Sequence, residues 1–389
     1  MILRYNYRLY PTKLQEYNLM QSAGNARFIW NHFLQENKIT YEYQKKFNFY
    51  NEMSAELTKL KKKYSWLSTS YAQILQAKLK DLDLALRQVK RGFPKFKSKW
   101  AGNDTFRYTQ NTSVSESRLH LPKIGDVKIK LHRELPKYSS VSIKKENNKW
   151  FASFVVDIQE IPNLNYRNTI GIDVNANNVA LSNGEIFITP RPNRKYKLKL
   201  KQLQKNISRK KKKSKNRARV RLIYQKLNTH IRNIRKDFLH KISSRIVKVS
   251  GLVCTETLNI EQMKKNHLSA ICIADNGWRY LFGMLDYKCR LFGKSFHQIN
   301  QWLASSQTCN SCGNRKRMPV DIREYTCVEC GYIEDRDINA AKNISKWGFQ
   351  EFFGSKKGEE ISCVDVVFGM LLMDNESSTQ KKHEAVCFS

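Results

Sequence analysis

Four cysteines form two close pairs late in the sequence. Cys309 and Cys312 make one Cys-x-x-Cys pair, Cys327 and Cys330 make the second, and fourteen residues separate the pairs. Four thiolates on two such turns are the ligand set of a closed, tetrahedral zinc site, which stabilises a fold and leaves no open position for chemistry. The spacing therefore predicts one structural Zn²⁺ without a catalytic role.

The remaining cysteines are scattered rather than paired in the sequence. They are Cys254, Cys272, Cys289, Cys363 and Cys387. Isolated thiols beside one metal site indicate a reducing compartment rather than a disulfide framework.

Three acids stand where short apolar segments end or a helix begins. Asp173 follows Ile-Gly-Ile, Glu256 ends the run that starts at Gly251, and Asp337 opens the last helix. A sheet that holds two such strand ends together, with a helix start beside them, gathers carboxylates that repel each other. Two Mg²⁺ ions about 3.5–4 Å apart offset that repulsion and supply phosphodiester hydrolysis. Ordinary strand-end and helix-start acids remain the alternative at this point.

Basic residues are concentrated between positions 194 and 221, where fifteen of twenty-eight residues are Lys or Arg. Such a run is often only a solvated face. Leucines interleaved with the charges favour an anchored helix that contacts a nucleic-acid backbone instead. The candidate contacts, including one further along the same helical stretch, are Arg209, Lys210, Lys211, Lys212, Lys213, Lys215, Arg217 and Arg235.

The overall charge points to the same class of partner. The 389 residues carry 70 Lys+Arg against 34 Asp+Glu, a net charge of +36, with 41% hydrophobic residues. This composition excludes a disordered polyelectrolyte and predicts a folded protein that binds a polyanion. An anionic membrane surface is the rival partner, but no apolar run reaches the roughly 18–20 residues of a spanning helix. We expect a soluble, intracellular protein.

Sequence periodicity divides the chain into an N-terminal β-module and a later α/β part. Residues 2–10 alternate as a strand, residues 12–91 are helical, and residues from about 104 to 158 alternate again. The first strand can join the later ones, which makes the helical block an insertion into a small β-module. Thr12 with Gln15 predicts a capping box at the start of that block.

The second half alternates short strands with helical stretches. Predicted strands are 170–173, 179–181, 186–188, 251–256 and 295–299, with Asn183-Gly184 as a hairpin turn. A basic helical stretch covers about 194–249, and the last helix begins near Asp335. Beyond residue 348 the periodicity is lost, and we predict a flexible tail over 349–389.

Several segments, in order along the chain, resemble the TnpB family of transposon-encoded RNA-guided nucleases, which are related to compact type V CRISPR effectors. The resemblance covers the chain to about residue 348. The segments are 7–12 (YRLYPT), 26–31 (ARFIWN), 92–97 (GFPKFK), 106–110 (FRYTQ), 207–211 (ISRKK), 235–241 (RKDFLHK), the two cysteine pairs and 335–341 (DRDINAA).

The resemblance implies an α/β multidomain fold with a ribonuclease-H-like RuvC domain, an inserted zinc ribbon and an N-terminal β-barrel wedge module that carries a helical recognition module. The implied boundaries are 1–11 and 92–166 for the wedge module, 12–91 for the recognition module, 167–304 and 333–348 for the RuvC domain, 305–332 for the zinc ribbon and 349–389 for the tail.

The resemblance also implies Asp173, Glu256 and Asp337 as catalytic ligands of two Mg²⁺ or Mn²⁺ ions, with Asp335 as the fallback for Asp337. A guide RNA from the end of the element would pair with double-stranded target DNA next to a short motif. Two positions depart from the family pattern: Asn175 replaces the usual glycine, and Thr257 replaces a common acid. The oligomeric state is not predicted.

Other functions compete with a guided endonuclease. A cleavage-deficient RNA-guided DNA-binding regulator is expected to lack one of the acids, and all three are present. A DNA-joining transposase with a ribonuclease-H-like site is disfavoured rather than excluded, whereas a tyrosine- or serine-based recombinase would need a nucleophile among Arg and His partners. A generic zinc-ribbon binder would leave the three acids unexplained.

Overall fold

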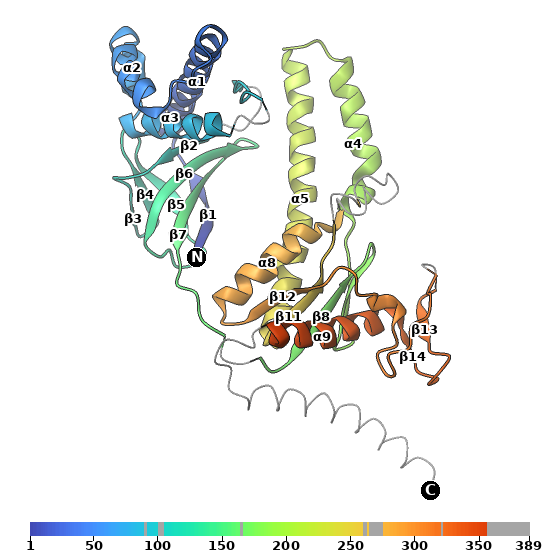
Figure 1. Ribbon diagram of the computed structural model, residues 1–389. Helices are drawn as coiled ribbons and strands as arrows, with labels where there is room; N and C mark the ends of the chain where they lie inside the picture. The colour runs from blue at the N-terminus through green and yellow to red at the C-terminus, as the bar shows by residue number, and fades with distance from the viewer. Residues whose placement is uncertain are drawn as a thin grey trace. The chain divides into compact units, whose positions relative to one another are not determined.

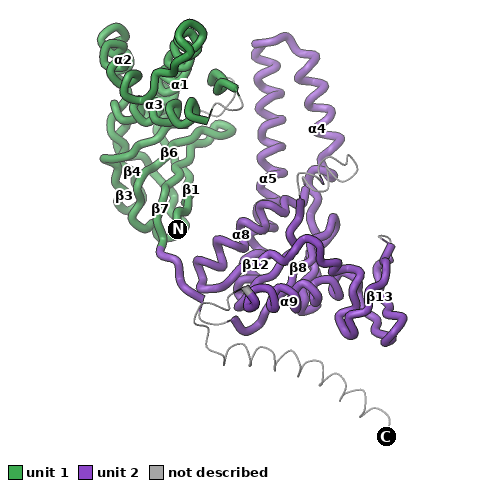
Figure 2. The backbone as a smooth tube through the Cα atoms, viewed as in Figure 1, with its two compact units in different colours: residues 1–158 green, residues 159–389 purple. Residues whose placement is uncertain are grey.

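The computed structural model describes residues 1–88, 92–99, 105–163, 166–259, 263, 275–319 and 322–355. The chain forms two compact units, residues 1–158 and residues 159–389 (Figure 2). Within the described ranges, no helix has both the length and the hydropathy that a membrane crossing needs.

The first unit is built on a seven-stranded antiparallel sheet in the order β2-β6-β7-β1-β5-β4-β3 (Figure 1). The N-terminal strand lies between β7 and β5, so the prediction that it joins the later strands is confirmed. The edge strands β2 and β3 do not pair with each other in the described part of the chain. The strands therefore form an open sheet rather than the expected barrel. The strands are β1 (Ile2–Tyr10), β2 (Thr105–Tyr108), β3 (Ser113–Ser115), β4 (Arg118–Leu121), β5 (Gly125–Lys130), β6 (Tyr138–Glu146) and β7 (Lys149–Asp157).

The helical block inserted after β1 has a core of its own. Thr12 caps the first helix, with the Gln15 backbone N–H donating to Oγ1 of Thr12 at 3.3 Å, and the predicted capping box is confirmed. Leucines that recur at helical spacing near the end of this block, Leu75, Leu79, Leu82 and Leu86, are buried. The elements are α1 (Lys13–Gln44), α2 (Tyr50–Lys63), the 3₁₀ helix η1 (Ser65–Thr69) and α3 (Ala72–Arg87).

The first unit ends earlier than the expected boundary at residue 166. Strand β7 ends at Asp157, and the Ile158 backbone N–H donates to the Met1 carbonyl at 2.9 Å, one residue beyond the end of the β1–β7 pairing. Ile161 already bonds to the Arg290 carbonyl of the second unit, at 3.2 Å. The residues from 159 therefore belong to the second unit.

The second unit contains a mixed five-stranded sheet in the order β10-β9-β8-β11-β12. The pairs β10–β9 and β9–β8 are antiparallel, whereas β8–β11 and β11–β12 are parallel. Parallel neighbours require long crossovers, which here contain helices. The elements are β8 (Thr169–Val174), β9 (Asn178–Leu181), β10 (Ile186–Ile188), α4 (Pro192–Arg209), α5 (Lys215–Val249), β11 (Leu252–Glu256), α8 (Trp278–Leu291), β12 (Ser295–Ile299) and α9 (Arg336–Ser355).

Helices cover both faces of this sheet. Ile172 and Val253 pack with α5 and α8 on one face, and Cys254 and Ile299 pack with α9 on the other. Figure 1 shows α9 lying across the strands. Gly171 faces α9, whose backbone lies too close to this strand to leave room for any side chain there.

Helix α9 runs past the predicted end at residue 348. Phe349, Phe352 and Phe353 are buried against the sheet, and the ring centroid of Phe352 lies 5.4 Å from that of Tyr166. The boundary at 348 is therefore wrong, because these aromatics extend the apolar face of the helix. The rest of the predicted tail, from residue 356, lies outside the described residues.

The cysteine-rich segment between β12 and α9 forms a small, separate substructure. It contains the 3₁₀ turn η4 (Ser305–Gln307) and a two-stranded antiparallel sheet of β13 (Glu324–Thr326) and β14 (Ile333–Asp335). Tyr325 is fully buried in it against two of the cysteines.

We predict that Gly171→Ala destabilises the second unit. A Cβ at this position would lie 2.0 Å from the Ala341 carbonyl oxygen and 2.5 Å from the Ser345 nitrogen, both backbone atoms that cannot move independently. The loss in unfolding free energy is expected at about 3 kcal/mol, the upper end of the usual range for overpacking. Urea denaturation measures it.

Gly283→Ala is the matched control. Gly283 lies inside α8, and no atom lies within 4 Å of a Cβ placed there. Alanine is there expected to be neutral or to stabilise by up to about 1 kcal/mol through helix propensity. Equal stabilities of the two variants would contradict the close approach of α9.

Candidate active site and metal centre

Asp173 and Glu256 lie side by side at one edge of the five-stranded sheet. Strands β8 and β11 are parallel neighbours, and Ile172 pairs with Thr255, so the next residue of each strand is an acid. Side chains alternate along a strand, and two residues earlier Gly171 and Cys254 face α9. Both carboxylates therefore face α9 as well.

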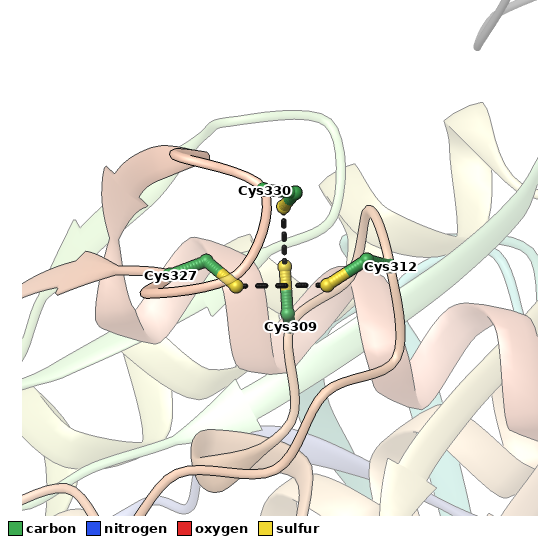
Figure 3. A group of neighbouring side chains, drawn as sticks. All are labelled: Cys309, Cys312, Cys327 and Cys330. Atoms are coloured by element: carbon green, nitrogen blue, oxygen red, sulfur yellow. Dashed lines mark hydrogen bonds between the residues drawn. The ribbon is translucent and has the colours of Figure 1, made fainter.

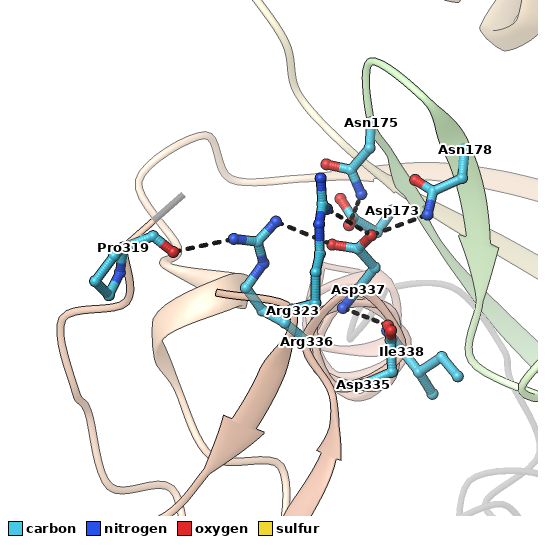
Figure 4. Close-up of polar contacts among 9 residues, drawn as sticks. All are labelled: Asp173, Asn175, Asn178, Pro319, Arg323, Asp335, Arg336, Asp337 and Ile338. Atoms are coloured by element: carbon cyan, nitrogen blue, oxygen red, sulfur yellow. Dashed lines mark hydrogen bonds and ion pairs between the residues drawn. The ribbon is translucent and has the colours of Figure 1, made fainter. Parts of the chain in front are cut away.

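Asp337 comes to the same place from the first turn of α9. Its carboxylate is 2% exposed, and it accepts from the amide nitrogen of Asn178 at 3.0 Å (Figure 4). Asp335 has a different role, because its Oδ1 accepts from the backbone N–H groups of Asp337 and Ile338 at 2.9 and 3.1 Å. Asp335 thus caps the helix, and Asp337 is the acid that faces the other two.

The three carboxylates are close enough to repel each other. Burial, followed by repulsion from Glu256 and then from Asp337, raises the pKa of the Asp173 carboxyl to about 8. Burial also raises the pKa of Glu256, although the Ser305 hydroxyl that donates to it acts in the opposite direction. A group of acids whose charged forms are this costly is well suited to bind cations.

Two arginines partly neutralise Asp337. Nη1 of Arg323 lies 3.4 Å from its Oδ2, and Nη2 of Arg336 lies 3.3 Å from its Oδ1. Arg323 directly precedes β13 of the cysteine-rich substructure, and its side chain is 54% exposed. The side chain of Arg336 is only 10% exposed, so Arg323 is the arginine with more room to move. Sequence reasoning missed the contact of Arg336 with Asp337, although Arg336 stands inside the DRDINAA segment.

Two asparagines orient the acids. Nδ2 of Asn175 donates to Asp173 at 2.6 Å, so the residue that departs from the family glycine holds a candidate ligand. A carboxylate only accepts, so the amide nitrogen of Asn178 must face Asp337 and its oxygen must point elsewhere. That oxygen is buried without a hydrogen-bond partner. An orphaned neutral oxygen beside three acids fits a site for hard divalent cations.

Thr257, the second departure from the family pattern, has a structural contact. Its hydroxyl donates to the Ile299 carbonyl at 2.7 Å, which ties the end of β11 to the end of β12. Thr257 therefore secures the strand end that presents Glu256.

The four cysteines converge as their spacing predicts. Their sulfur atoms all lie within 4.8 Å of one another, with Cys309–Cys330 at 3.7 Å and Cys312–Cys327 at 3.5 Å (Figure 3). Tetrahedral Zn–S bonds of about 2.3 Å place sulfurs about 3.8 Å apart, so the group fits zinc. Among the described residues, no other group of three or more His, Cys, Asp or Glu side chains has its ligand atoms this close together. The carboxylates of the three acids are therefore further apart than the four sulfur atoms.

Helix α9 fixes the cysteine-rich substructure next to the acids. Asn339 accepts from the Asn310 backbone N–H at 3.0 Å and donates to the Thr308 carbonyl at 2.8 Å. Asn343, one turn later, donates to the carbonyls of Ser305 and Thr308 at 2.9 and 2.6 Å. One helix thus carries an acid and holds the first cysteine turn.

The predicted nucleic-acid contacts lie on the hairpin of α4 and α5, which extends from the sheet (Figure 1). Arg209 ends α4, the lysines 210–213 form the connection, and Lys215 and Arg217 begin α5. Arg235 lies twenty residues along α5 from Lys215, or about 30 Å at 1.5 Å per residue. The structure therefore gathers seven of the eight residues at the hairpin tip and leaves Arg235 apart.

Three family models match parts of the chain. Residues 153–267 match a family described as "Probable transposase", residues 278–344 match "Cas12f1-like, TNB domain", and residues 1–46 match "Helix-turn-helix domain". In the structure, the last of these segments is strand β1 followed by the single long helix α1 rather than a helix-turn-helix.

Two relatives match over most of their length. A protein of Streptomyces pristinaespiralis named "Putative RNA-guided DNA endonuclease" is 32% identical over 353 residues, 87% of this chain and 88% of that protein. "Putative RNA-guided DNA endonuclease InsQ" of Escherichia coli (strain K12) is 29% identical, over 87% of this chain and 90% of that protein. A solved "Cas12f1-sgRNA-target DNA complex" aligns with 16% identity and a TM-score of 0.35 over 89% of this chain and 99% of that one.

We predict that the purified protein carries one zinc ion per chain and that Cys312→Ser loses it, because three thiolates hold zinc far more weakly than four. The melting temperature of the variant falls as well, since metal binding and folding are coupled. Elemental analysis and thermal unfolding measure both.

Cys289→Ala is the control, because Cys289 is a buried core cysteine far from the four sulfurs in the sequence. It is expected to keep one zinc ion per chain. Equal zinc content in wild type and Cys312→Ser would show that the four cysteines are not the binding site.

Proposed function

This chain belongs to the TnpB family, and we propose that it is an RNA-guided DNA endonuclease of a transposable element. The observation that carries the proposal is the meeting of Asp173, Glu256 and Asp337 at one edge of the sheet in the second unit. The names of relatives aligned over nearly their whole length support the same activity.

The sheet supports the assignment of a ribonuclease-H-like RuvC domain. Two acids end adjacent parallel strands, and the third begins the helix that covers the same face. This arrangement brings residues from three distant parts of the chain to one point. We therefore assign residues 159–304 and 333–355 to the proposed nuclease domain, with the cysteine-rich substructure as an inserted zinc ribbon.

In the proposed mechanism, Asp173, Glu256 and Asp337 would hold two Mg²⁺ or Mn²⁺ ions, and the amide oxygen of Asn178 would add a neutral donor. Ions held there would supply activation of a water molecule and stabilisation of the leaving oxygen of the phosphodiester. Asn175 holds the Asp173 carboxylate in position through its amide nitrogen. Asp173 must give up the proton that its raised pKa favours before it can bind a cation.

Arg323 supplies a movable positive charge at the edge of the site. Its guanidinium lies against Asp337 and is half exposed, so it can exchange this carboxylate for a phosphate of the incoming strand. Arg336 is buried and also donates to the Pro319 carbonyl at 3.2 Å, so it stays with Asp337. The zinc ribbon thus has a direct part in substrate binding as well as a structural one.

The partners follow from the charge and from the family. A guide RNA from the end of the element pairs with one strand of target DNA, and base pairing supplies the sequence specificity. The tip of the α4–α5 hairpin, residues 209–217, binds the phosphate backbone of RNA or of the heteroduplex. With a net charge of +36, the protein gains affinity from counterion release along the whole complex. The cytoplasm, at the nucleoid, is where these partners meet.

A DNA-joining transposase is the second candidate, because the model matching residues 153–267 is described as "Probable transposase". The same acids would then direct the 3′-hydroxyl of one DNA end at another strand. A strand-transfer assay separates the two functions: joined products favour the transposase, and hydrolysed ends alone favour the endonuclease.

We predict that Asp173→Ala, Glu256→Ala and Asp337→Ala each lower DNA cleavage by more than a hundredfold, beyond the roughly 10- to 100-fold loss that outer partners of a metal site cause. Target binding by the RNA-loaded protein survives, because these acids contribute no attraction to phosphate. Cleavage of a labelled target and its gel-shift affinity are the two readouts.

Asp335→Ala is the matched control, since Asp335 lies two residues from Asp337 and caps α9. It is expected to cost about 1 kcal/mol of stability and to keep cleavage. Retained cutting by any of the first three variants would mean that this acid is not a ligand.

We predict that the double variant Lys211→Ala with Lys212→Ala, at the hairpin tip, binds RNA more weakly. The slope of log affinity against log salt concentration should fall in magnitude by about 1.4, because each neutralised phosphate of a single strand contributes about 0.7. Lys241→Ala with Lys248→Ala removes the same charge from exposed positions on the part of α5 that packs on the sheet. Equal slopes for the two double variants would mean that the lysines at the tip are only solvent-exposed and do not contact phosphate.

A further inference from the structure

Trp302 is 81% exposed, in contrast to Trp30, Trp150 and Trp278, which are buried. Tryptophan has a large apolar surface, and leaving it in water forfeits the stabilisation that burial gives. An exposed indole on a loop whose backbone is held by hydrogen bonds therefore indicates a binding contact. The position of this loop in the second unit indicates which partner the indole contacts.

The loop begins beside the acids. Strand β12 ends at Ile299, which pairs with Glu256 in the parallel register. The next residue, Asn300, has its backbone N–H held by the Glu351 carboxylate of α9 at 3.2 Å, and its own side-chain oxygen accepts from the Trp302 backbone N–H at 3.1 Å. The backbone that carries the indole is thus fixed to the end of β12.

The loop also ends beside the acids. The hydroxyl of Ser305 donates to Glu256, and the Ser305 carbonyl accepts from Asn343 of α9 at 2.9 Å. Three residues span at most about 10 Å, so Trp302 cannot lie further than this from the Ser305 backbone. Trp302 is therefore an exposed aromatic residue whose backbone is held at the rim of the acid site.

We propose that Trp302 stacks on a base of the DNA strand that enters the acid site. The inference rests on the proposed function and adds a subsite to it. Pairing of the guide RNA with one DNA strand displaces the other strand, and its unpaired bases have apolar faces without a partner. Every base has such a face, so an aromatic platform holds the strand without reading its sequence. Specificity then stays with the guide RNA.

The test uses the RNA-loaded protein and a target whose non-guide-paired strand carries 2-aminopurine near the cut. Stacking quenches this base, so the Trp302→Ala complex should be brighter than wild type, with cleavage efficiency reduced about tenfold to a hundredfold. Trp302→Leu keeps apolar bulk without an aromatic ring and should behave like alanine. Trp302→Phe should retain most of the quenching and cleavage.

Phe292→Ala is the matched control. Phe292 is also an exposed aromatic, at 59%, but it precedes β12 and so stands at the opposite edge of the sheet. It should leave fluorescence and cleavage unchanged. Melting temperatures of all variants identify any that fail to fold.

The outcomes separate the two proposals. If 2-aminopurine quenching and cleavage are the same with and without Trp302, the stacking proposal is wrong. The proposed endonuclease function is then unaffected. Full activity in Trp302→Leu with loss in Trp302→Ala means that a protein segment covers the indole, which also overturns it. Quenching that depends on Trp302 without any cleavage by wild type supports the subsite and refutes the nuclease.

Discussion

Electrostatic repulsion among three buried carboxylates is the constraint on which the second unit depends. Asp173 is 8% exposed and Asp337 only 2%, so water screens their charges poorly. Each comes from a rigid element: two from adjacent parallel strands and one from the first turn of α9. The absence of a side chain at Gly171 lets α9 approach the sheet closely enough to bring the third acid in. The fold thus gathers acids whose repulsion is relieved by protonation of Asp173, by the arginines at Asp337 or by a bound cation.

Helix α9 connects this site to the rest of the second unit. Its first turn carries Asp337, its next turns hold the cysteine-rich substructure through Asn339 and Asn343, and its end holds the β12 loop through Glu351. Arg323, delivered by that substructure, contacts Asp337. Hydrogen bonds and one ion pair thus connect the cysteine-rich substructure to the helix that carries Asp337.

The elements and the gathering of the acids were predictable from the sequence, because strands that end in Asp173 and Glu256 have a clear local pattern. The convergence of the four cysteines was predictable for the same reason, since ligand spacing is local. The contacts of Asn178 and Arg323 were not, because they depend on which distant segment lies opposite. The extension of α9 through Phe352 was missed because its apolar residues can be recognised as a helix face only once the sheet that buries them is known. The catalytic role of the acids is still a prediction.

The most direct test of the account is calorimetric titration of Mg²⁺ into the zinc-loaded protein at pH 7, in buffers of different ionisation enthalpy. A pKa of about 8 leaves the Asp173 carboxyl mostly protonated at this pH, and a cation binds only the carboxylate. The account predicts saturable binding with release of about one proton per chain, and loss of that release in Asp173→Asn. No saturable binding, or binding without proton release, would contradict it.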